Sequence, residues 1–261
     1  MHRLWDRMRL ARFLVLGRVG MDLYADPPGT RIEEAARYVS AIGGSAGNIA
    51  VALARQGIEV GLISCLSDDA VGRYCLAELA RYGVGAAHVR SVTGGVRTSL
   101  AVTETRAAGC QTVLYRNGAA DFDLTESDVT KVDFAPLAAL VVTGTALAAE
   151  PSRAASLLAI RRARAAGALV VLDIDYRAYS WAGRDEAADV CLMAARAADI
   201  VVGNDEEFAL LARGPGGLEL ARQIAGETAL LVVYKQGAAG SVTLTADYQF
   251  VTGIYPVSAL K

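Results

Sequence analysis

The sequence predicts an α/β protein with a mostly parallel central sheet covered by helices on both faces. Short runs of β-branched and other apolar residues alternate with longer helical patterns along the 261 residues. The apolar runs are continuous, which is typical of parallel strands buried on both faces. Gly57, Gly83 and Gly167 stand where helices should end, and glycine is favoured just beyond the last helical turn.

The predicted elements follow one another in a regular order. Strands are expected at Phe13–Gly17, Val60–Cys65, Ala139–Gly144, Leu169–Asp173, Ile200–Gly203 and Ala229–Tyr234. Helices are expected at Ala46–Gln56, Asp69–Tyr82, Ser152–Ala166, Asp185–Ala197 and Leu218–Ala225. Because ligands of such sheets bind at the carboxyl ends of the strands, polar residues that follow strands are the first candidates for function.

One interval breaks this order. The residues from Arg97 to Tyr115, RTSLAVTETRAAGCQTVLY, form two alternating segments around a turn at Ala107–Gly109, a pattern typical of a β-hairpin. A third strand of this small unit is expected at Ala36–Ile42. We therefore predict one domain over residues 1–261 with a β lid, formed by parts of about 22–42 and 97–120, that closes over a ligand.

Composition excludes several functional classes. The chain is 53% hydrophobic and 21% charged with a formal net charge of −2, which gives no reason to expect nucleic acid or an anionic membrane as a partner. No apolar run approaches the ~20 residues of a membrane span. The ten residues MHRLWDRMRL lack the pattern of a signal peptide and are expected to be a frayed extension.

The cysteines and histidines indicate neither a metal site nor a disulfide framework. The four cysteines, Cys65, Cys75, Cys110 and Cys191, are isolated in the sequence, which fits a reducing cytoplasm. His2 and His88 lie far from any nucleophile pattern, so we expect no Ser-His-Asp site and no histidine-bound metal.

The stretch IGGSAGNIAVALARQG, from Ile42 to Gly57, resembles a cradle for a small molecule. Gly43 and Gly44 would let a ligand approach the backbone, and Ser45 is a candidate helix cap with Asn48 on the first turn. Free amides at a helix start favour oxygen-rich or anionic groups. The commoner alternative is a tight turn before a closely packed helix.

Polar residues follow several predicted strands. Asp22, in GRVGMDLY, is placed to accept hydrogen bonds from sugar hydroxyls, although a turn or cap aspartate is an equal alternative. Arg116 and Asp121, in YRNGAAD, suit an acidic substrate or simply end a charged hairpin. Asp173 and Arg177, in LDIDYR, leave a strand end that should face the crevice. Asp69, in SDDAVG, is interpreted as a helix cap.

Two further motifs suit phosphate chemistry. Asn204 and Glu207 are three residues apart in GNDEEF. If a helix starts there, they share a face and could hold a hydrated Mg²⁺, while an Asn cap with acidic first-turn residues is equally compatible with the spacing. Lys235, Gly237 and Gly240 end a strand in YKQGAAG. They could neutralise a polyphosphate, or form a plain hairpin turn, since no Walker A pattern is present.

Taken together and in this order, the motifs resemble those of the ribokinase (phosphofructokinase-B) family of carbohydrate kinases. The resemblance covers nearly the whole chain after residue 12 and includes RTSLAVTET, the Asn204–Glu207 motif and KQGAAGS. It implies a ribokinase-like three-layer αβα fold and MgATP-dependent phosphorylation of a sugar. On the sugar it implies contacts from Asp22, Gly43, Gly44, Asn48, Arg116, Asp173 and Arg177. For the nucleotide it implies Asn204, Lys235, Gly237 and Gly240, with Glu207 for Mg²⁺.

Within the family, GRVGMDLY, YRNGAADFDL, VVTGTAL and LDIDYR are most similar to the members that phosphorylate 5-dehydro-2-deoxygluconate in myo-inositol catabolism. The resemblance implies that Arg116 and Arg177 pair with the carboxylate of such a sugar acid. A fructokinase, a 2-keto-3-deoxygluconate kinase or a non-catalytic sugar-binding protein are the alternatives. A nicotinamide-dependent oxidoreductase is disfavoured because no GxGxxG follows the first strand. A homodimer through an exposed lid edge is a further expectation.

The family's second signature is a Gly-Ala-Gly-Asp segment that supplies the anion hole and the aspartate base. The sequence stops at GIYPVSALK, about where that segment should begin, so the base is expected beyond Lys261 and no catalytic residue is identified. Because phosphoryl transfer depends on positioning and electrostatic stabilisation, we expect the chain as given to be incomplete at its carboxyl end and at best a weak kinase.

Overall fold

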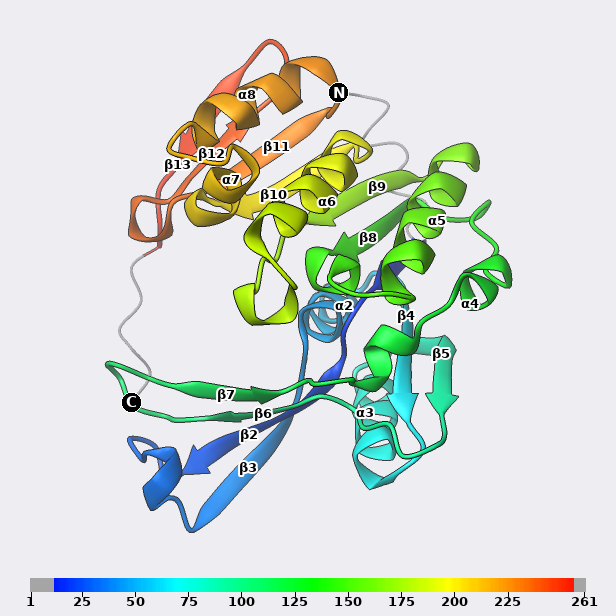
Figure 1. Cartoon of the computed structure of the whole chain (residues 1–261), viewed down its shortest axis with the longest axis vertical. Coiled ribbons are helices and arrows are strands. Elements are labelled where there is room, and N and C mark those ends of the chain that lie inside the picture. Colours follow the sequence, from blue (N-terminus) through cyan, green and yellow to red (C-terminus); the bar gives the residue numbers. More distant parts are fainter. Residues whose placement is uncertain (1–11, 256–261) are drawn as a thin grey trace.

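The computed structural model describes residues 12–255, and a large sheet runs through its centre (Figure 1). Its strands lie in the order β13-β12-β11-β10-β9-β8-β1-β4-β5. They are β1 (Arg12–Leu16), β4 (Glu59–Ser67), β5 (Gly85–Val92), β8 (Ala139–Thr143), β9 (Leu169–Asp173), β10 (Ile200–Asn204), β11 (Leu231–Lys235), β12 (Ser241–Leu244) and β13 (Gln249–Thr252). Neighbouring strands from β5 to β11 are parallel. Strand β12 pairs antiparallel with β11, and β13 pairs antiparallel with β12 at the edge of the sheet.

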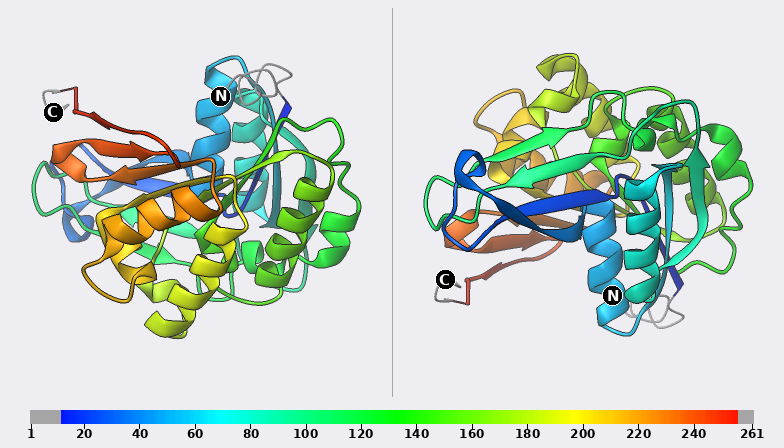
Figure 2. Two further views of the ribbon diagram at one scale, coloured as in Figure 1. Left: turned by 90° about the horizontal axis from the view of Figure 1, so that it is seen from above. Right: turned by 90° about the horizontal axis from the view of Figure 1, so that it is seen from below.

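Helices cover the sheet on both faces (Figure 2). They are α2 (Ser45–Arg55), α3 (Ala70–Arg81), α4 (Glu126–Thr130), α5 (Ser152–Ala165), α6 (Arg184–Arg196), α7 (Asp205–Leu211) and α8 (Gly217–Glu227). Strand β1 shows why two layers form, because side chains alternate across a strand. Phe13 and Val15 pack in one core with α2 and α3, while Leu14 and Leu16 pack in the other with α5, α6 and α8. The predicted three-layer arrangement is confirmed.

A smaller sheet stands off the large one at the end where β1 leads into it (Figure 1). It consists of β2 (Gly20–Asp26), β3 (Arg37–Gly43), β6 (Leu100–Thr103) and β7 (Thr112–Tyr115), in the order β3-β2-β6-β7. The predicted hairpin is therefore confirmed as β6 and β7, and the predicted third strand as β3. Its action as a lid, and the treatment of residues 1–261 as one domain, stay predictions.

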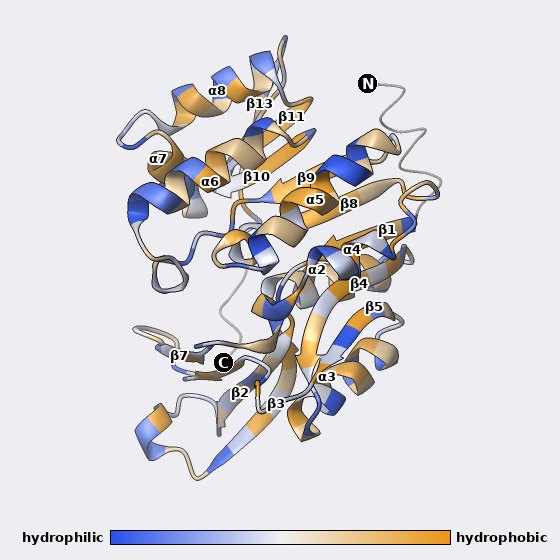
Figure 3. Ribbon diagram, turned by 45° about the vertical axis from the view of Figure 1, so that its right-hand side comes forward, coloured by the Kyte–Doolittle hydropathy of each residue, from blue (hydrophilic) through white to orange (hydrophobic). Residues whose placement is uncertain are grey.

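Most expected elements agree with the structure to within one or two residues. Asp69 caps α3 as interpreted, since its Oδ1 accepts hydrogen bonds from the amides of Val71 at 2.9 Å and Gly72 at 3.0 Å. Strand β5 was not predicted, because its residues, GAAHVRSV, alternate only weakly and lie at a half-exposed edge. The apolar strands and the polar outer faces of the helices are visible in Figure 3.

Sheet register brings the ends of four strands together. Asp173 of β9 pairs with Thr143 of β8 and Val202 of β10, and Asn204 of β10 pairs with Lys235 of β11. Polar residues from distant parts of the chain therefore meet at one edge, next to the small sheet. Among residues 12–255, no helix is long and apolar enough to cross a membrane. The expected amino-terminal extension lies outside the described residues.

Candidate active site

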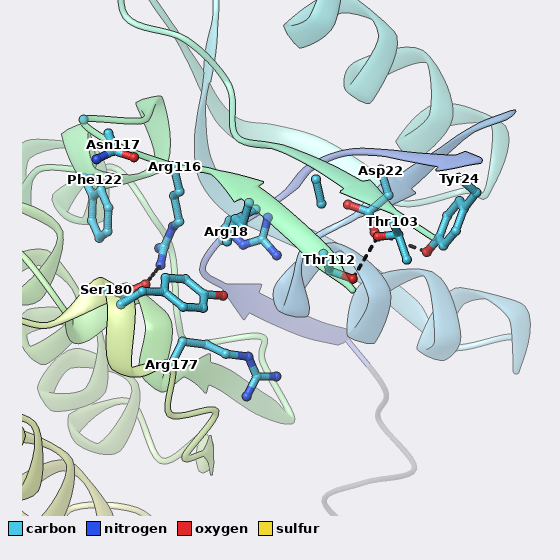
Figure 4. A pocket seen from close by; sticks show the side chains of 14 residues that line it. Arg18, Asp22, Tyr24, Thr103, Thr112, Arg116, Asn117, Phe122, Arg177 and Ser180 are labelled. Atoms are coloured by element: carbon cyan, nitrogen blue, oxygen red, sulfur yellow. Dashed lines mark hydrogen bonds between the residues drawn. The ribbon is translucent and has the colours of Figure 1, made fainter. Parts of the chain in front are cut away.

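A cleft opens between the carboxyl ends of the central strands and the small sheet (Figure 4). It has a cavity of about 800 Å³ and a second, smaller one of about 160 Å³. The two share the lining residues Arg18, Asp22, Arg116, Arg177 and Tyr179. The larger cavity also contacts the inner face of β6 and β7, and the smaller one the start of α2. The small sheet therefore forms one wall of a single polar site.

Asp22 lines this cleft, and its carboxylate has few hydrogen-bond partners among the described residues. It lies in the middle of β2, and its Oδ1 is buried without a hydrogen-bond partner among the described residues. Its Oδ2 has only a long contact of 3.4 Å from the Tyr24 hydroxyl. Burial raises the pKa of Asp22, and the nearby charge of Arg18 opposes that rise. A buried acceptor without a partner is costly, so a ligand hydroxyl bound at this carboxylate would relieve that cost.

The glycine pair shapes the wall beside Asp22. A Cβ at Gly43 would collide with the Asp22 carboxylate, so only glycine allows β3 to pass this close. Gly44 has φ 89° and is the N-cap of α2, while Ser45 is the first helical residue. The proposed Ser45 cap is therefore wrong: its hydroxyl lies 3.1 Å from that of Thr145 instead. With no side chain at the N-cap, the start of α2 stays open to the smaller cavity.

The amides at this helix start are only partly free. Gly47 donates to the carbonyl of Arg18 at 3.2 Å, and Asn48 donates to the carbonyl of Gly44 at 2.8 Å. The side chain of Asn48 lines the smaller cavity together with Gly44 and Asp22. The structure thus brings Asp22, Gly43, Gly44 and Asn48 together, which the family resemblance implied as contacts to one sugar. Their roles in binding stay predictions.

Arg116 lines both cavities but is held by protein groups. Its Nε and Nη2 donate to Oδ2 of Asp121, with the Nε contact at 3.1 Å, and both residues are about 5% exposed. Nη2 also donates to the Thr145 carbonyl at 2.9 Å, and Nη1 to the Ser180 hydroxyl at 3.1 Å. The guanidinium lies over the ring of Phe122 at 4.1 Å. Arg116 therefore connects the segment that follows β7 to the segments that follow β8 and β9.

Arg177 is also paired, although it is more exposed. Its Nη2 lies 2.9 Å from Oδ1 of Asp175, and its side chain is 48% exposed. Asp175 is buried, adopts φ 39° and accepts a hydrogen bond from the Thr145 hydroxyl at 3.1 Å. Asp175 therefore holds the charge of Arg177 beside the cleft.

Arg18 is a cleft residue that the sequence analysis missed. Its Nη1 donates to the Ser99 hydroxyl at 3.0 Å, and it lines both cavities. It lies in the motif GRVGMDLY, four residues before Asp22. A single arginine after a strand carries no spacing signal, and Ser99 is distant in sequence, so the sequence offered nothing to single it out. Tyr179, which also lines both cavities, was missed for the same reason.

The residues predicted for the nucleotide lie along the neighbouring edge, at the ends of β10 and β11. Lys235 and Asp173 face each other at 3.9 Å, and neither lines the two cavities. Burial and the charge of Asp175 raise the pKa of Asp173 to about 6. Gly237 and Gly240 have φ values of 54° and 91° in the turn before β12. Asp173, expected on the sugar side, thus lies beside Lys235.

Asn204 and Glu207 form a reciprocal cap at the start of α7. Asn204 Oδ1 accepts from the Glu207 amide at 2.8 Å, and Glu207 Oε2 accepts from the Asn204 amide at 2.7 Å. Glu207 Oε1 accepts from the amide of Tyr176 at 3.1 Å. The capping alternative is confirmed, and the metal role of Glu207 stays a prediction. Within residues 12–255, no group of three or more His, Cys, Asp or Glu side chains could hold a metal ion.

The sequence model of pfkB family carbohydrate kinases matches residues 11–260. The chain belongs to this family. A 5-dehydro-2-deoxygluconokinase of Photobacterium profundum is 38% identical over 254 residues, which cover 95% of this chain and 77% of that relative. The chain is therefore a carbohydrate kinase by descent, and the predicted family is confirmed.

Solved structures agree with this membership. A PfkB protein from Polaromonas sp. JS666 is 28% identical and has a TM-score of 0.80, covering 95% of this chain and 84% of that one. A fructokinase variant from Vibrio cholerae O395, solved with fructose, ADP and potassium ion, is 26% identical with a TM-score of 0.82 over 95% and 77% of the two chains. The ribokinase-like fold class is thus confirmed.

Proposed function

We propose that this pfkB carbohydrate kinase uses ATP to phosphorylate a hydroxyl of a sugar acid, 5-dehydro-2-deoxygluconate, in myo-inositol catabolism. The observation that carries the proposal is the mixed character of the cleft. Asp22 offers an unpartnered acceptor for sugar hydroxyls, while Arg18, Arg116 and Arg177 surround the same cavities. Because Asp121 and Asp175 balance the charges of Arg116 and Arg177, it is the guanidinium of Arg18 that favours an anionic sugar over a neutral one. The name of the Photobacterium profundum relative supports the same substrate.

The strand-end edge is the proposed nucleotide site. The side chain of Lys235 is 45% exposed there, and the turn containing Gly237 and Gly240 leaves the backbone accessible. Both features suit phosphate oxygens, and Asn204 lies beside Lys235 in the sheet register. Because Glu207 already accepts two backbone amides, Mg²⁺ would be held chiefly by phosphate oxygens and water, with Glu207 orienting that shell. Bound Mg²⁺ would neutralise charge on the transferring phosphoryl group.

The proposed division of labour follows from these positions. Asp22 and Asn48 would orient the sugar hydroxyls, and the small sheet would exclude water from the cleft. We assign no catalytic base among residues 12–255. Binding is therefore measured beside turnover.

The test measures ADP release with MgATP and, in parallel, ligand binding by titration calorimetry. The sugars are 5-dehydro-2-deoxygluconate, 2-keto-3-deoxygluconate and fructose. We expect tightest binding and fastest ADP release with the first, by about tenfold or more. A preference for fructose would overturn the substrate assignment and favour the fructokinase alternative. Tight binding of the acid without ADP release would favour a non-catalytic sugar-binding protein.

Two further proposals concern the whole molecule. A homodimer through the small sheet is supported by exposed apolar side chains on its two edge strands, Tyr38 and Val39 of β3 and Val113 and Tyr115 of β7. Sedimentation velocity would show a single monomeric species if that proposal were wrong. A cytoplasmic location fits the four free cysteines, since disulfides are uncommon in reducing compartments.

A further inference from the structure

Arg18 carries a charge that the described part of the protein leaves without an ion-pair partner. Of the five N–H donors of a guanidinium, Arg18 uses one, towards Ser99. Among residues 12–255, no carboxylate oxygen lies within 4.0 Å of a guanidinium nitrogen of Arg18, the distance that defines an ion pair. Its side chain is only partly exposed. Burial and the charge of Arg116 lower the pKa of Arg18, and the carboxylates of Asp121 and Asp22 offset this only in part.

The other two arginines of the cleft differ in this respect. Arg116 is paired with Asp121, and Arg177 is paired with Asp175. Each of these carboxylates is buried at 5% exposure. The two pairs are therefore neutral overall, whereas the charge of Arg18 remains. Charged groups that are removed from water are normally paired, and a ligand carboxylate would complete the set.

The position of Arg18 is fixed by the backbone around it. Its carbonyl accepts the Gly47 amide at 3.2 Å. A Cβ at Gly44 would lie 2.5 Å from that carbonyl oxygen. A Cβ at Gly20 would lie 2.6 Å from the Ser99 hydroxyl and 3.2 Å from Arg18 Nη1. The two glycines thus allow close packing around Arg18, so its side chain is ordered before any ligand binds. This order lowers the entropic penalty of binding.

Arg18 also lies where the two cavities meet. In Figure 4 its guanidinium points into the cleft between Asp22 on one side and Arg116 and Arg177 on the other. A sugar acid has hydroxyls along its chain and a carboxylate at one end. With its hydroxyls at Asp22, such a molecule can place its carboxylate at the free donors of Arg18.

We infer that Arg18 binds the carboxylate of the substrate and thereby selects sugar acids over neutral sugars. The inference rests on the proposed function, because it needs an acidic substrate. It assigns the carboxylate to Arg18 in place of Arg116 and Arg177, whose guanidinium groups already have carboxylate partners. Arg18 then acts by charge-assisted, two-pronged hydrogen bonding, for which a guanidinium is suited and an ammonium is not.

The test compares Arg18→Gln and Arg18→Lys with the unaltered chain. Glutamine keeps a donor for Ser99 but has no charge, and lysine keeps the charge but not the fork. Arg161→Gln is the matched control, since Arg161 is exposed on α5 and lines neither cavity. Titration calorimetry measures the Kd of 5-dehydro-2-deoxygluconate and of fructose, and differential scanning fluorimetry measures Tm without ligand.

For Arg18→Gln we expect a weakening of about 10- to 100-fold for the acid and less than about threefold for fructose. Arg18→Lys should fall between, and Arg161→Gln should match the unaltered chain. Tm without ligand should stay the same or rise for Arg18→Gln, because an unpaired charge has been removed. That result would separate a lost ligand contact from a damaged fold.

Three outcomes would overturn the inference, and they are distinguishable. If the unaltered chain binds the acid tightly and Arg18→Gln binds it equally well, Arg18 is not the carboxylate site, although the proposed function stands. If the unaltered chain shows no preference for the acid over fructose, the acidic substrate itself is wrong and the inference fails with it. An equal loss for both sugars in Arg18→Gln would indicate a structural role.

Discussion

The sugar side and the nucleotide side of this site use their charged groups differently. In the cleft under the small sheet, Asp22 and Arg18 keep polar atoms that make no hydrogen bond to a described residue. At the ends of β10 and β11, Asn204 and Glu207 bind each other's backbone amides, and Lys235 lies 3.9 Å from Asp173 in a more open setting. The cleft keeps polar groups for a ligand, whereas the polar groups of the strand-end edge are largely bonded to other protein groups.

This difference indicates where specificity resides. Interactions between charges are stronger in an enclosed cleft than at an open edge, because less water screens them. Selection among sugars should therefore depend on a few side chains in the cleft. Changes along the strand-end edge should act more on stability and on phosphate binding in general. Substitutions in the two regions test whether their effects on binding and stability separate in this way.

The largest effect is expected where a cleft residue is structural. Arg116→Met leaves Asp121 buried without its partner, and breaking a buried ion pair costs about 3–5 kcal/mol. We expect the free energy of unfolding, measured by urea denaturation, to fall by that amount.

The double variant Arg116→Met/Asp121→Asn should recover part of the loss, because the unpaired charge is then absent. Full stability of Arg116→Met combined with loss of acid binding would show that Arg116 belongs with the ligand-binding groups and not with the framework.

A smaller effect, measured on binding, is expected at Asp22. Asp22→Asn should weaken 5-dehydro-2-deoxygluconate binding about 30- to 100-fold, or about 2–3 kcal/mol, since hydrogen bonds to a charged acceptor contribute about 1.5–3 kcal/mol. Titration calorimetry measures the change.

Asp26→Asn is the matched control on the same strand, where Asp26 lies 3.0 Å from Arg37 at the surface. It should leave binding unchanged. Equal binding by Asp22→Asn and the unaltered chain would remove Asp22 from the sugar site.

The smallest effect is expected on the strand-end edge, and it should be stabilising. The pKa of Asp173 is about 6 in the folded chain, above its usual value of 3.8. The folded state therefore holds the proton more tightly than the unfolded chain, and stability falls as the pH rises through this range. At pH 7.5 the ionised carboxylate destabilises the fold, so Asp173→Asn should add about 1–2 kcal/mol to the free energy of unfolding.

The gain should shrink as the pH falls from 6 towards 4, where Asp173 in the unaltered chain is protonated as well. Urea denaturation at several pH values measures it. A stabilisation that does not depend on pH would mean that the charge of Asp173 is not its cause.

Much of the fold followed from local pattern. Continuous apolar runs predicted the buried strands. The family resemblance of GRVGMDLY and IGGSAGNIAVALARQG implied that Asp22 and the glycine pair contact one sugar, and Asp22 and Gly44 do line one cavity. Capping chemistry is equally local: Asp69 with Gly72, and Asn204 with Glu207, are three residues apart. Such interactions depend on spacing along the chain, and the sequence alone determines them.

Which charged residues remain without a partner depends on the tertiary structure. From the sequence, Arg116 and Arg177 had the same standing as ligand-binding groups, and Arg18 had none. The fold buries Arg116 against Asp121 and pairs Arg177 with Asp175. It brings Arg18 to Ser99, 81 residues away, with no carboxylate of residues 12–255 in ion-pair contact. Both ion pairs are local in sequence, but their burial depends on distant residues such as Thr145 and Ser180. The isolation of Arg18 likewise depends on contacts that spacing along the chain does not encode.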